Sequence, residues 1–223
     1  MKRLLPVLLV ALALNSCMDL QVKMKLQSDW SGTASFDLVM LDQMYQMIKM
    51  QVQQSGQDVF LLQDNEAQAR ATLESTLESE GARLTKFVNK VEDGMRTVSV
   101  EILFKDGKKL IEQNGSDILS LKQEGEMWRL SFMDMETNSA FQGMGQEELE
   151  QSLAMMQPMM AGLKMNFEVT VPQMVETNMK KGTGSATFAL SFDDDVAGQS
   201  GKLAADAFQQ LMSPKWITFK GMK

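Results

Sequence analysis

The sequence of 223 residues contains no histidine, one cysteine, four prolines and one tyrosine. Without histidine, the chain cannot use Ser-His or Cys-His nucleophilic pairs or histidine-ligated metals, which are the usual routes to general-base and zinc chemistry. With one cysteine it has no internal disulfide, so the burial of apolar side chains must hold the fold together. These absences favour a noncatalytic protein with no cofactor and no metal site.

Catalysis by carboxylates alone would require paired acids. Two groups are candidates, Asp193-Asp194-Asp195 and the pair Asp134 and Glu136. Three adjacent aspartates before a helix are typical of a solvated cap, since calcium needs six to eight oxygens from several positions. Gly182-Thr183-Gly184 is too short for a phosphate-binding loop and predicts a tight turn. We therefore predict that the protein is not an enzyme.

The N-terminus has the pattern of an export signal. Lys2 and Arg3 form a positive segment, and residues 4–14 form an apolar segment of 11 residues. This segment is too short to cross a bilayer, which takes about 20 apolar residues. We predict that residues 1–16 are a lipoprotein signal peptide, and that residues 17–223 are one mature domain.

The segment Leu14-Asn15-Ser16-Cys17 resembles the bacterial lipobox, in which a leucine lies three residues before an invariant cysteine. The resemblance implies that Cys17 is linked to diacylglycerol, becomes the first mature residue and is usually acylated on its amino group. Each buried CH₂ contributes about 0.8 kcal/mol, so two or more acyl chains give stable attachment. The alternative is an ordinary signal peptide followed by a chance cysteine.

Lipidation would place the protein in the bacterial cell envelope, as a membrane-anchored lipoprotein on the periplasmic or outer-membrane face. Met18, rather than aspartate, follows the cysteine, which in some Gram-negative sorting rules indicates the outer membrane. Removal of Lys2 and Arg3 leaves 20 basic residues against 29 acidic ones, a net charge of −9. This charge disfavours nucleic acid and anionic lipid surfaces as partners. Attachment to the membrane is therefore expected to depend on the acyl chains.

The mature chain contains many segments in which apolar and polar residues alternate, the pattern of half-buried strands. Short turns such as 28–32, 92–94 and 124–126 separate several of these segments and predict hairpins. Strands joined in this way form an antiparallel sheet with one solvent-exposed face. The alternating segments are 20–26, 34–40, 82–91, 96–104, 118–123, 127–133, 165–171, 186–192 and 216–219.

Helical periodicity appears in 41–54, in 65–80, in 147–157 and in a last segment that runs from Asp195 to Leu211, while 134–146 reads as a loop. The helices must cover the apolar face of the sheet. We predict one α+β domain: a twisted antiparallel sheet of several hairpins with helices packed on one face.

The chain resembles the LppM-type bacterial lipoproteins in four features. These are the lipobox, the segment CMDLQVKMKLQSDWSGTASFDLVM after it, a mostly helical insertion, and the later segments FEVTVPQMVETN and GTGSATFALSFDDD. The resemblance covers roughly residues 17–195. It implies a twisted antiparallel sheet packed by helices, and a role in binding envelope lipids or glycolipids. Many members also carry a C-terminal transmembrane helix, whereas residues 196–223 here contain no apolar run of 18 residues.

Methionine is unusually frequent, with 20 in the mature chain. Three interpretations remain open: packing of a core, a deformable groove for an acyl chain or partner helix, and a soft-metal site for Cu(I) on Met44, Met47 and Met50. Oxidation sensing is a further possibility. The candidate ligand-binding residues are Met40, Met44, Tyr45, Met47, Ile48, Met156 and Met160.

Two functional hypotheses follow. The first is a membrane-tethered, noncatalytic lipoprotein that binds an apolar or amphipathic ligand, a lipid or glycolipid, in a Met-rich pocket between sheet and helices. The nearly all-round apolar segment 41–54 motivates it. The second is a structural or assembly lipoprotein that docks an envelope protein through a sheet edge or helix.

Overall fold

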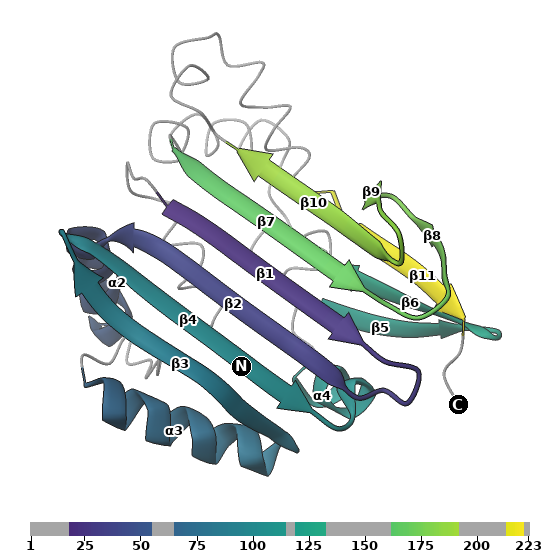
Figure 1. Cartoon of the computed structure of the whole chain (residues 1–223), viewed down its shortest axis with the longest axis horizontal. Helices are drawn as coiled ribbons and strands as arrows, with labels where there is room; N and C mark the ends of the chain where they lie inside the picture. The colour runs from purple at the N-terminus through teal and green to yellow at the C-terminus, as the bar shows by residue number, and fades with distance from the viewer. Residues whose placement is uncertain (1–17, 55–64, 115–118, 133–161, 192–212, 221–223) are drawn as a thin grey trace, which may run out of the picture.

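The computed structural model describes residues 18–54, 65–114, 119–132, 162–191 and 213–220. Within them the strands form two sheets (Figure 1). Sheet A has seven strands in the order β3-β4-β2-β1-β7-β10-β9, and sheet B has four in the order β5-β6-β11-β8. The fold is therefore α+β and dominated by strands, as the alternating segments indicated.

The element bounds are as follows. The strands of sheet A are β1 (Met18–Leu26), β2 (Gly32–Leu41), β3 (Ala82–Glu92), β4 (Met95–Phe104), β7 (Leu163–Thr170), β9 (Lys180–Lys181) and β10 (Ser185–Ser191). The strands of sheet B are β5 (Leu119–Glu124), β6 (Met127–Phe132), β8 (Met174–Thr177) and β11 (Lys215–Lys220). The helices are α2 (Asp42–Gln54), α3 (Glu66–Ser79) and α4 (Gly107–Asn114).

The three early hairpins are confirmed: β1 pairs with β2, β3 with β4, and β5 with β6, all antiparallel. In the β3–β4 turn, Asp93 and Gly94 have φ angles of 51° and 76°, the positive values of the tight turn that an Asp-Gly pair favours. In the β1–β2 turn, Asp29 accepts hydrogen bonds from the hydroxyl and the N–H of Ser31 at 2.6 and 3.0 Å. These bonds hold the pKa of the Asp29 carboxyl below its ordinary value, the hydroxyl bond having the larger effect.

The prediction of a wholly antiparallel sheet is wrong at one junction. Strand β1 pairs with β7 in parallel, with Met18 opposite Leu163 and Lys25 opposite Thr170. A parallel pair has the same alternation of side chains as an antiparallel pair, so the sequence pattern does not distinguish the two. The second sheet and strand β8, which pairs with β11 across a bulge between Thr218 and Phe219, were also not predicted.

The two sheets meet through apolar side chains. The ring of Trp30, in the β1–β2 turn, lies edge-on to Trp128 of β6 at 5.1 Å and to Phe219 of β11 at 6.1 Å between centroids. Residues Trp128, Leu130 and Phe132 of β6 are buried, as predicted from their alternation. The buried apolar residues of both sheets belong to one cluster, so sheet B covers part of the apolar face of sheet A (Figure 1).

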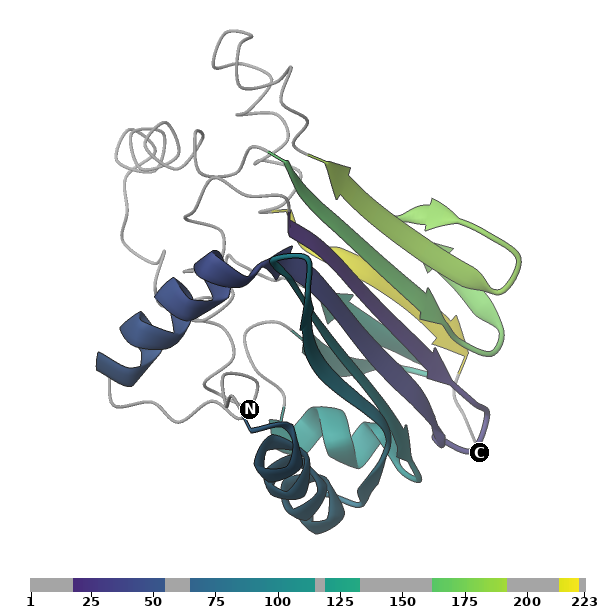
Figure 2. The same cartoon turned by 60° about the vertical axis from the view of Figure 1, so that its left-hand side comes forward.

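The three described helices contact different strands, and the predicted packing of the helices on one face of the sheet stays a prediction. Helix α3 begins after Asn65, whose side chain accepts from the N–H of Gln68 at 3.1 Å. It buries Ala69, Leu73 and Leu77 and packs on β3, whereas α4 contacts β5 and α2 contacts the ends of β2 and β4. Figure 2 shows that α2 extends from the end of sheet A and that α3 lies beside β3 of this sheet. The predicted helices at 147–157 and 195–211 and the loop at 134–146 lie outside the described residues.

Candidate functional site

Helix α2 is attached to the end of sheet A by buried residues on its first turn and just before it. Met40, Met44 and Tyr45 are 2%, 3% and 1% exposed. Met40 is the last buried residue of β2, and Met44 and Tyr45 lie in the first turn of α2, which starts directly after this strand. These three predicted ligand-binding residues therefore belong to the packed core, which is the first of the three interpretations of the methionines.

A buried polar network fixes the start of α2. Arg96 of β4 donates from Nε to Asp42 Oδ1 at 2.6 Å and from Nη1 to Asn89 Oδ1 at 2.7 Å. Its guanidinium lies 3.9 Å from the ring centroid of Tyr45, within the range of a cation–π contact. The N–H of Asp42 donates to the carbonyl of Gly94 at 2.9 Å. The first turn of α2 is thus held to the β3–β4 hairpin from two sides.

The outward face of α2 carries two exposed methionines. Met47 and Met50 are 36% and 55% exposed, and they lie three residues apart on one side of the helix. Gln43 is exposed as well, whereas the polar residues Asp42, Gln46 and Lys49 are half-buried. Two of the described side chains exposed on α2 are thus of a kind that a solvated helix normally buries.

Helix α2 leaves sheet A at the end where the predicted anchor joins it. Strand β1 begins at Met18, one residue after Cys17, and Asp19 lies opposite Val39 near the end of β2. We call this the anchor end, defined by Met18, Leu41 and the start of α2. The β1–β2 turn lies at the opposite end of β1, which at about 3.3 Å per residue is about 30 Å away. None of the described helices is both long and apolar enough to cross a membrane.

The remaining predicted site residues divide as follows. Met47 is exposed on α2, whereas Met40, Met44 and Tyr45 are buried. Cys17, Met156, Met160 and the side chain of Ile48 lie outside the described part of the chain. The Met-rich pocket that would join these residues stays a prediction.

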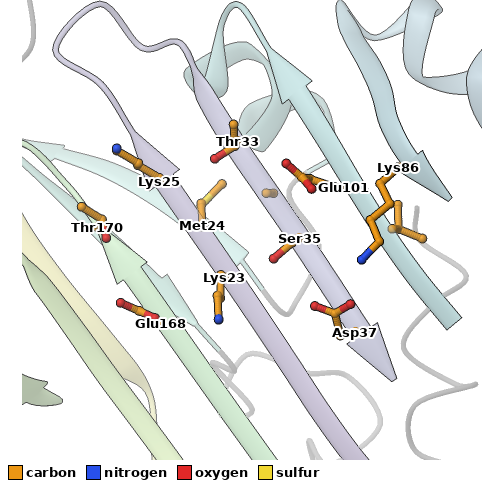
Figure 3. A pocket seen from close by; sticks show the side chains of 12 residues that line it. Lys23, Met24, Lys25, Thr33, Ser35, Asp37, Lys86, Glu101, Glu168 and Thr170 are labelled. Atoms are coloured by element: carbon orange, nitrogen blue, oxygen red, sulfur yellow. The ribbon is translucent and has the colours of Figure 1, made fainter. Parts of the chain in front are cut away.

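A second feature is a hollow of about 370 Å³ on the face of sheet A that points away from sheet B (Figure 3). Short hydroxyl side chains, Thr33 and Ser35 of β2 and Thr170 of β7, line it together with charged ones. The charged residues are Lys23, Lys25, Lys86, Asp37, Glu101 and Glu168. They come from five neighbouring strands and carry three charges of each sign.

Sequence reasoning missed this hollow. The alternation of 20–26 predicts Lys23 and Lys25 on the solvent-exposed face of a strand, and both are exposed, but their neighbours are set by pairing across five strands. Glu168 lies beside Lys23 only because β1 and β7 pair in parallel. One sequence signal could have indicated the hollow. It is a row of short hydroxyl residues flanked by long charged residues, in segments that are predicted to pair.

Among the described residues, no three His, Cys, Asp or Glu side chains lie close enough to hold a metal ion. Outside the hollow, Lys215 of β11 is buried between the sheets. Its Nζ lies 4.7 Å from the ring centroid of Phe188 and donates to the carbonyl of Ser213 at 2.8 Å. Burial lowers the pKa of this ammonium below its ordinary value. Lys215 lies apart from both candidate surfaces.

No protein-family model and no curated protein matches the chain. Among solved structures, the chain is similar to the NMR structure of the folded domain of LppM from Mycobacterium tuberculosis. The similarity covers 94% of this chain and 93% of that one, with 10% sequence identity and a TM-score of 0.44.

Proposed function

We propose that the protein is a membrane-tethered, noncatalytic lipoprotein of the bacterial cell envelope that binds an apolar or amphipathic ligand of the lipid class. The binding surface is the outward face of α2 at the anchor end, where Met47 and Met50 are exposed. The observation that carries the proposal is this exposure, on a helix whose base is fixed by Arg96 and Tyr45.

The chemistry of methionine suits such a surface. Its side chain is unbranched and polarizable, so it adapts to irregular apolar partners such as acyl chains. Met44 and Tyr45 hold the helix in place from its buried side, so the outward methionines are presented on a fixed base. A fixed support reduces the ordering cost of binding.

The position of α2 supports a ligand that comes from the bilayer. If Cys17 carries acyl chains, Met18 lies within one residue of the membrane surface. The start of α2 lies at the same end of sheet A, through the pairing of Asp19 with Val39. The absence of histidine from the whole chain supports binding without chemical conversion.

The double variant Met47→Gln/Met50→Gln is expected to weaken lipid binding tenfold or more. Burying a methionine fully contributes about 1.5–3 kcal/mol, and roughly half of this from each residue corresponds to a tenfold or larger change in Kd. The measurement is a titration of the mature chain, made acyl-free by Cys17→Ser, with a fluorescent phospholipid.

The control is Met127→Gln, because Met127 is similarly exposed, at 38%, but lies on β6 of sheet B. It should leave the Kd unchanged. Equal weakening by both variants, or no lipid binding by the parent chain, would contradict the proposal. Crosslinking from position 50 in cells to one dominant protein, rather than to lipid, would favour an assembly role instead.

A further inference from the structure

The hollow on sheet A follows from the register of its strands. Lys86 lies opposite Glu101, Glu101 opposite Ser35, Ser35 opposite Lys23, and Lys23 opposite Glu168. One row across β3, β4, β2, β1 and β7 therefore reads Lys, Glu, Ser, Lys, Glu. Short Ser35 interrupts the charges at its centre, and this is why the surface is hollowed there.

The hollow has an anionic side and a cationic side. On one side of β2 lie Lys23 and Lys25 of β1, and on the other lies Glu101 of β4, with Asp37 at one end of the floor (Figure 3). The backbones of β1 and β4 are two strand spacings apart, about 10 Å. Long side chains from both can therefore reach one small molecule placed over Ser35.

The charged side chains of the hollow do not pair with one another. Among the described residues, none of the six charged side chains of the hollow makes an ion pair within 4.0 Å or a side-chain hydrogen bond. Exposed charges elsewhere on the chain do pair, as Lys90 does with Glu92 at 2.8 Å.

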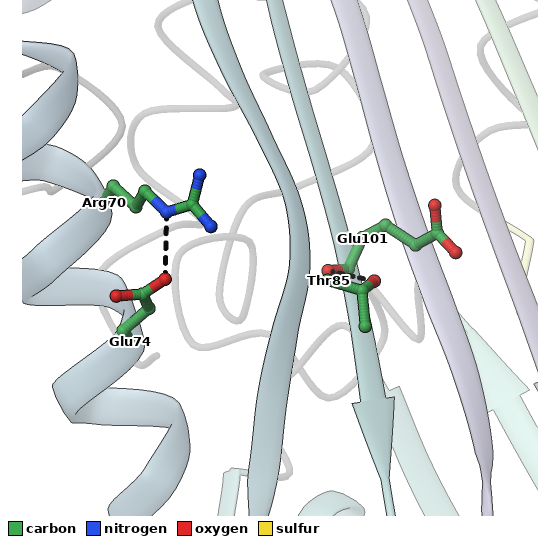
Figure 4. Close-up of polar contacts among 4 residues, drawn as sticks. All are labelled: Arg70, Glu74, Thr85 and Glu101. Atoms are coloured by element: carbon green, nitrogen blue, oxygen red, sulfur yellow. Dashed lines mark hydrogen bonds and ion pairs between the residues drawn. The ribbon is translucent and has the colours of Figure 1, made fainter.

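Glu101 illustrates how a carboxylate is kept available. The hydroxyl of Thr85 donates to the main-chain carbonyl of Glu101 at 3.0 Å, and the carboxylate points away from this contact (Figure 4). The strand position of Glu101 is thus fixed while its charged group stays unpaired. The same residue is only half-exposed, so a ligand would find its carboxylate partly desolvated.

We propose that this hollow binds a zwitterionic group, with an ammonium near Glu101 and Asp37 and a phosphate or carboxylate near Lys23 and Lys25. Its volume of about 370 Å³ falls in the range of small-molecule sites. Because the six charges balance, an ion of one sign would meet as much repulsion as attraction. A ligand with both charges satisfies both sides, and the hydroxyls of Thr33 and Ser35 can hydrogen-bond to it.

The site does not depend on α2 or on the proposed lipid surface. The test is calorimetric titration of the full mature lipoprotein, in a nonionic detergent, with phosphoethanolamine. Ethanolamine and glycerol phosphate serve as probes that each carry charge of one sign only, and both are expected to bind at least tenfold more weakly than the zwitterion. Lys23→Gln/Lys25→Gln and, separately, Glu101→Gln are each expected to weaken phosphoethanolamine binding tenfold or more.

A matched control is Lys122→Gln/Glu126→Gln, which removes one charge of each sign from the exposed β5–β6 hairpin. It should leave binding unchanged, and thermal melts of all variants should agree, since every substituted side chain lies on the surface.

Two forms of the ligand distinguish its source. If the site binds glycerophosphoethanolamine and a short-chain phosphatidylethanolamine with equal affinity, its ligand is a free zwitterion. Tighter binding of the lipid assigns it to a head group. No phosphoethanolamine binding, or equal binding of glycerol phosphate alone, would overturn the proposal and leave a solvated charged face.

Discussion

Replacing Gly32 with alanine is expected to lower the free energy of unfolding by about 3 kcal/mol or more, because overpacking a fitted core costs this much at its upper range. Gly32 is the first residue of β2 and lies opposite Leu26 on one side and Phe104 on the other. A Cβ at this position would collide with the main-chain carbonyl of Lys25 and would lie 2.7 Å from Phe104 Cζ.

Neither neighbour can move at low cost. The carbonyl of Lys25 belongs to the backbone of β1, and the Phe104 ring is 1% exposed within the core. The alanine variant therefore has to open the β1–β2 pairing at its turn. In a thermal melt of the acyl-free mature chain, we expect the Tm to fall by roughly 10 °C, since about 1 kcal/mol corresponds to 2–4 °C at this size.

Gly125→Ala provides the comparison. Gly125 has a φ of +67° and nothing within 4 Å of an added Cβ, so only backbone strain of about 1–2 kcal/mol is expected. A Gly32→Ala variant no less stable than Gly125→Ala would show that β1 and β2 do not approach as closely as described.

The second large effect is expected from Arg96→Ala, at about 3 kcal/mol of unfolding free energy. Removing one member of a buried ion pair costs about 3–5 kcal/mol, and the lower value applies because the side chain of Asp42 is 29% exposed while that of Arg96 is 8% exposed. The variant also loses the contact with the Tyr45 ring. Chemical denaturation of the acyl-free chain measures the change.

Arg70→Ala is the matched control. Arg70 pairs with Glu74 at 2.9 Å on the surface of α3 (Figure 4), with both side chains about half exposed. Such pairs contribute about 0.3–0.5 kcal/mol. If Arg96→Ala were as mild as Arg70→Ala, the network at the base of α2 would not hold the helix in place, and the presentation of Met47 and Met50 would lose its support.

The local elements of this fold could be predicted from the sequence because their signals are local. The alternation of Leu20 to Leu26, the Asp93-Gly94 turn and the spacing of Ala69, Leu73 and Leu77 each specify one strand, one hairpin or one helix. The burial of these residues agrees with that reading.

Long-range pairing could not be predicted in the same way. Strand β1 pairs in parallel with β7, which begins at Leu163, and no periodicity encodes the direction of a partner so distant in sequence. The charged hollow depends on this pairing. Likewise, the alternation of β4 places Arg96 on the same face as Val98 and Phe104, but it does not show which partners a charge would have there. Only the contacts with Asp42 and Asn89 do so.

The candidate methionines illustrate the limit of periodicity on an apolar helix. When most positions of a helix are apolar, the pattern does not determine which face packs on the protein. The structure buries Met44 and exposes Met47 and Met50, and this difference separates core packing from an exposed surface within one helix.

The most direct measurement compares two positions in the full lipoprotein reconstituted in phospholipid vesicles. Cys17 is expected to be acylated, so a cysteine introduced by Met50→Cys or by Ser28→Cys is the one free thiol for a fluorophore. Met50 is exposed on α2, the helix that begins at the anchor end, and Ser28 lies in the exposed turn at the other end of β1. With nitroxide-labelled lipids in the vesicles, we expect strong quenching at position 50 and little at position 28. Equal quenching, or stronger quenching at position 28, would contradict the orientation of the anchor end toward the bilayer.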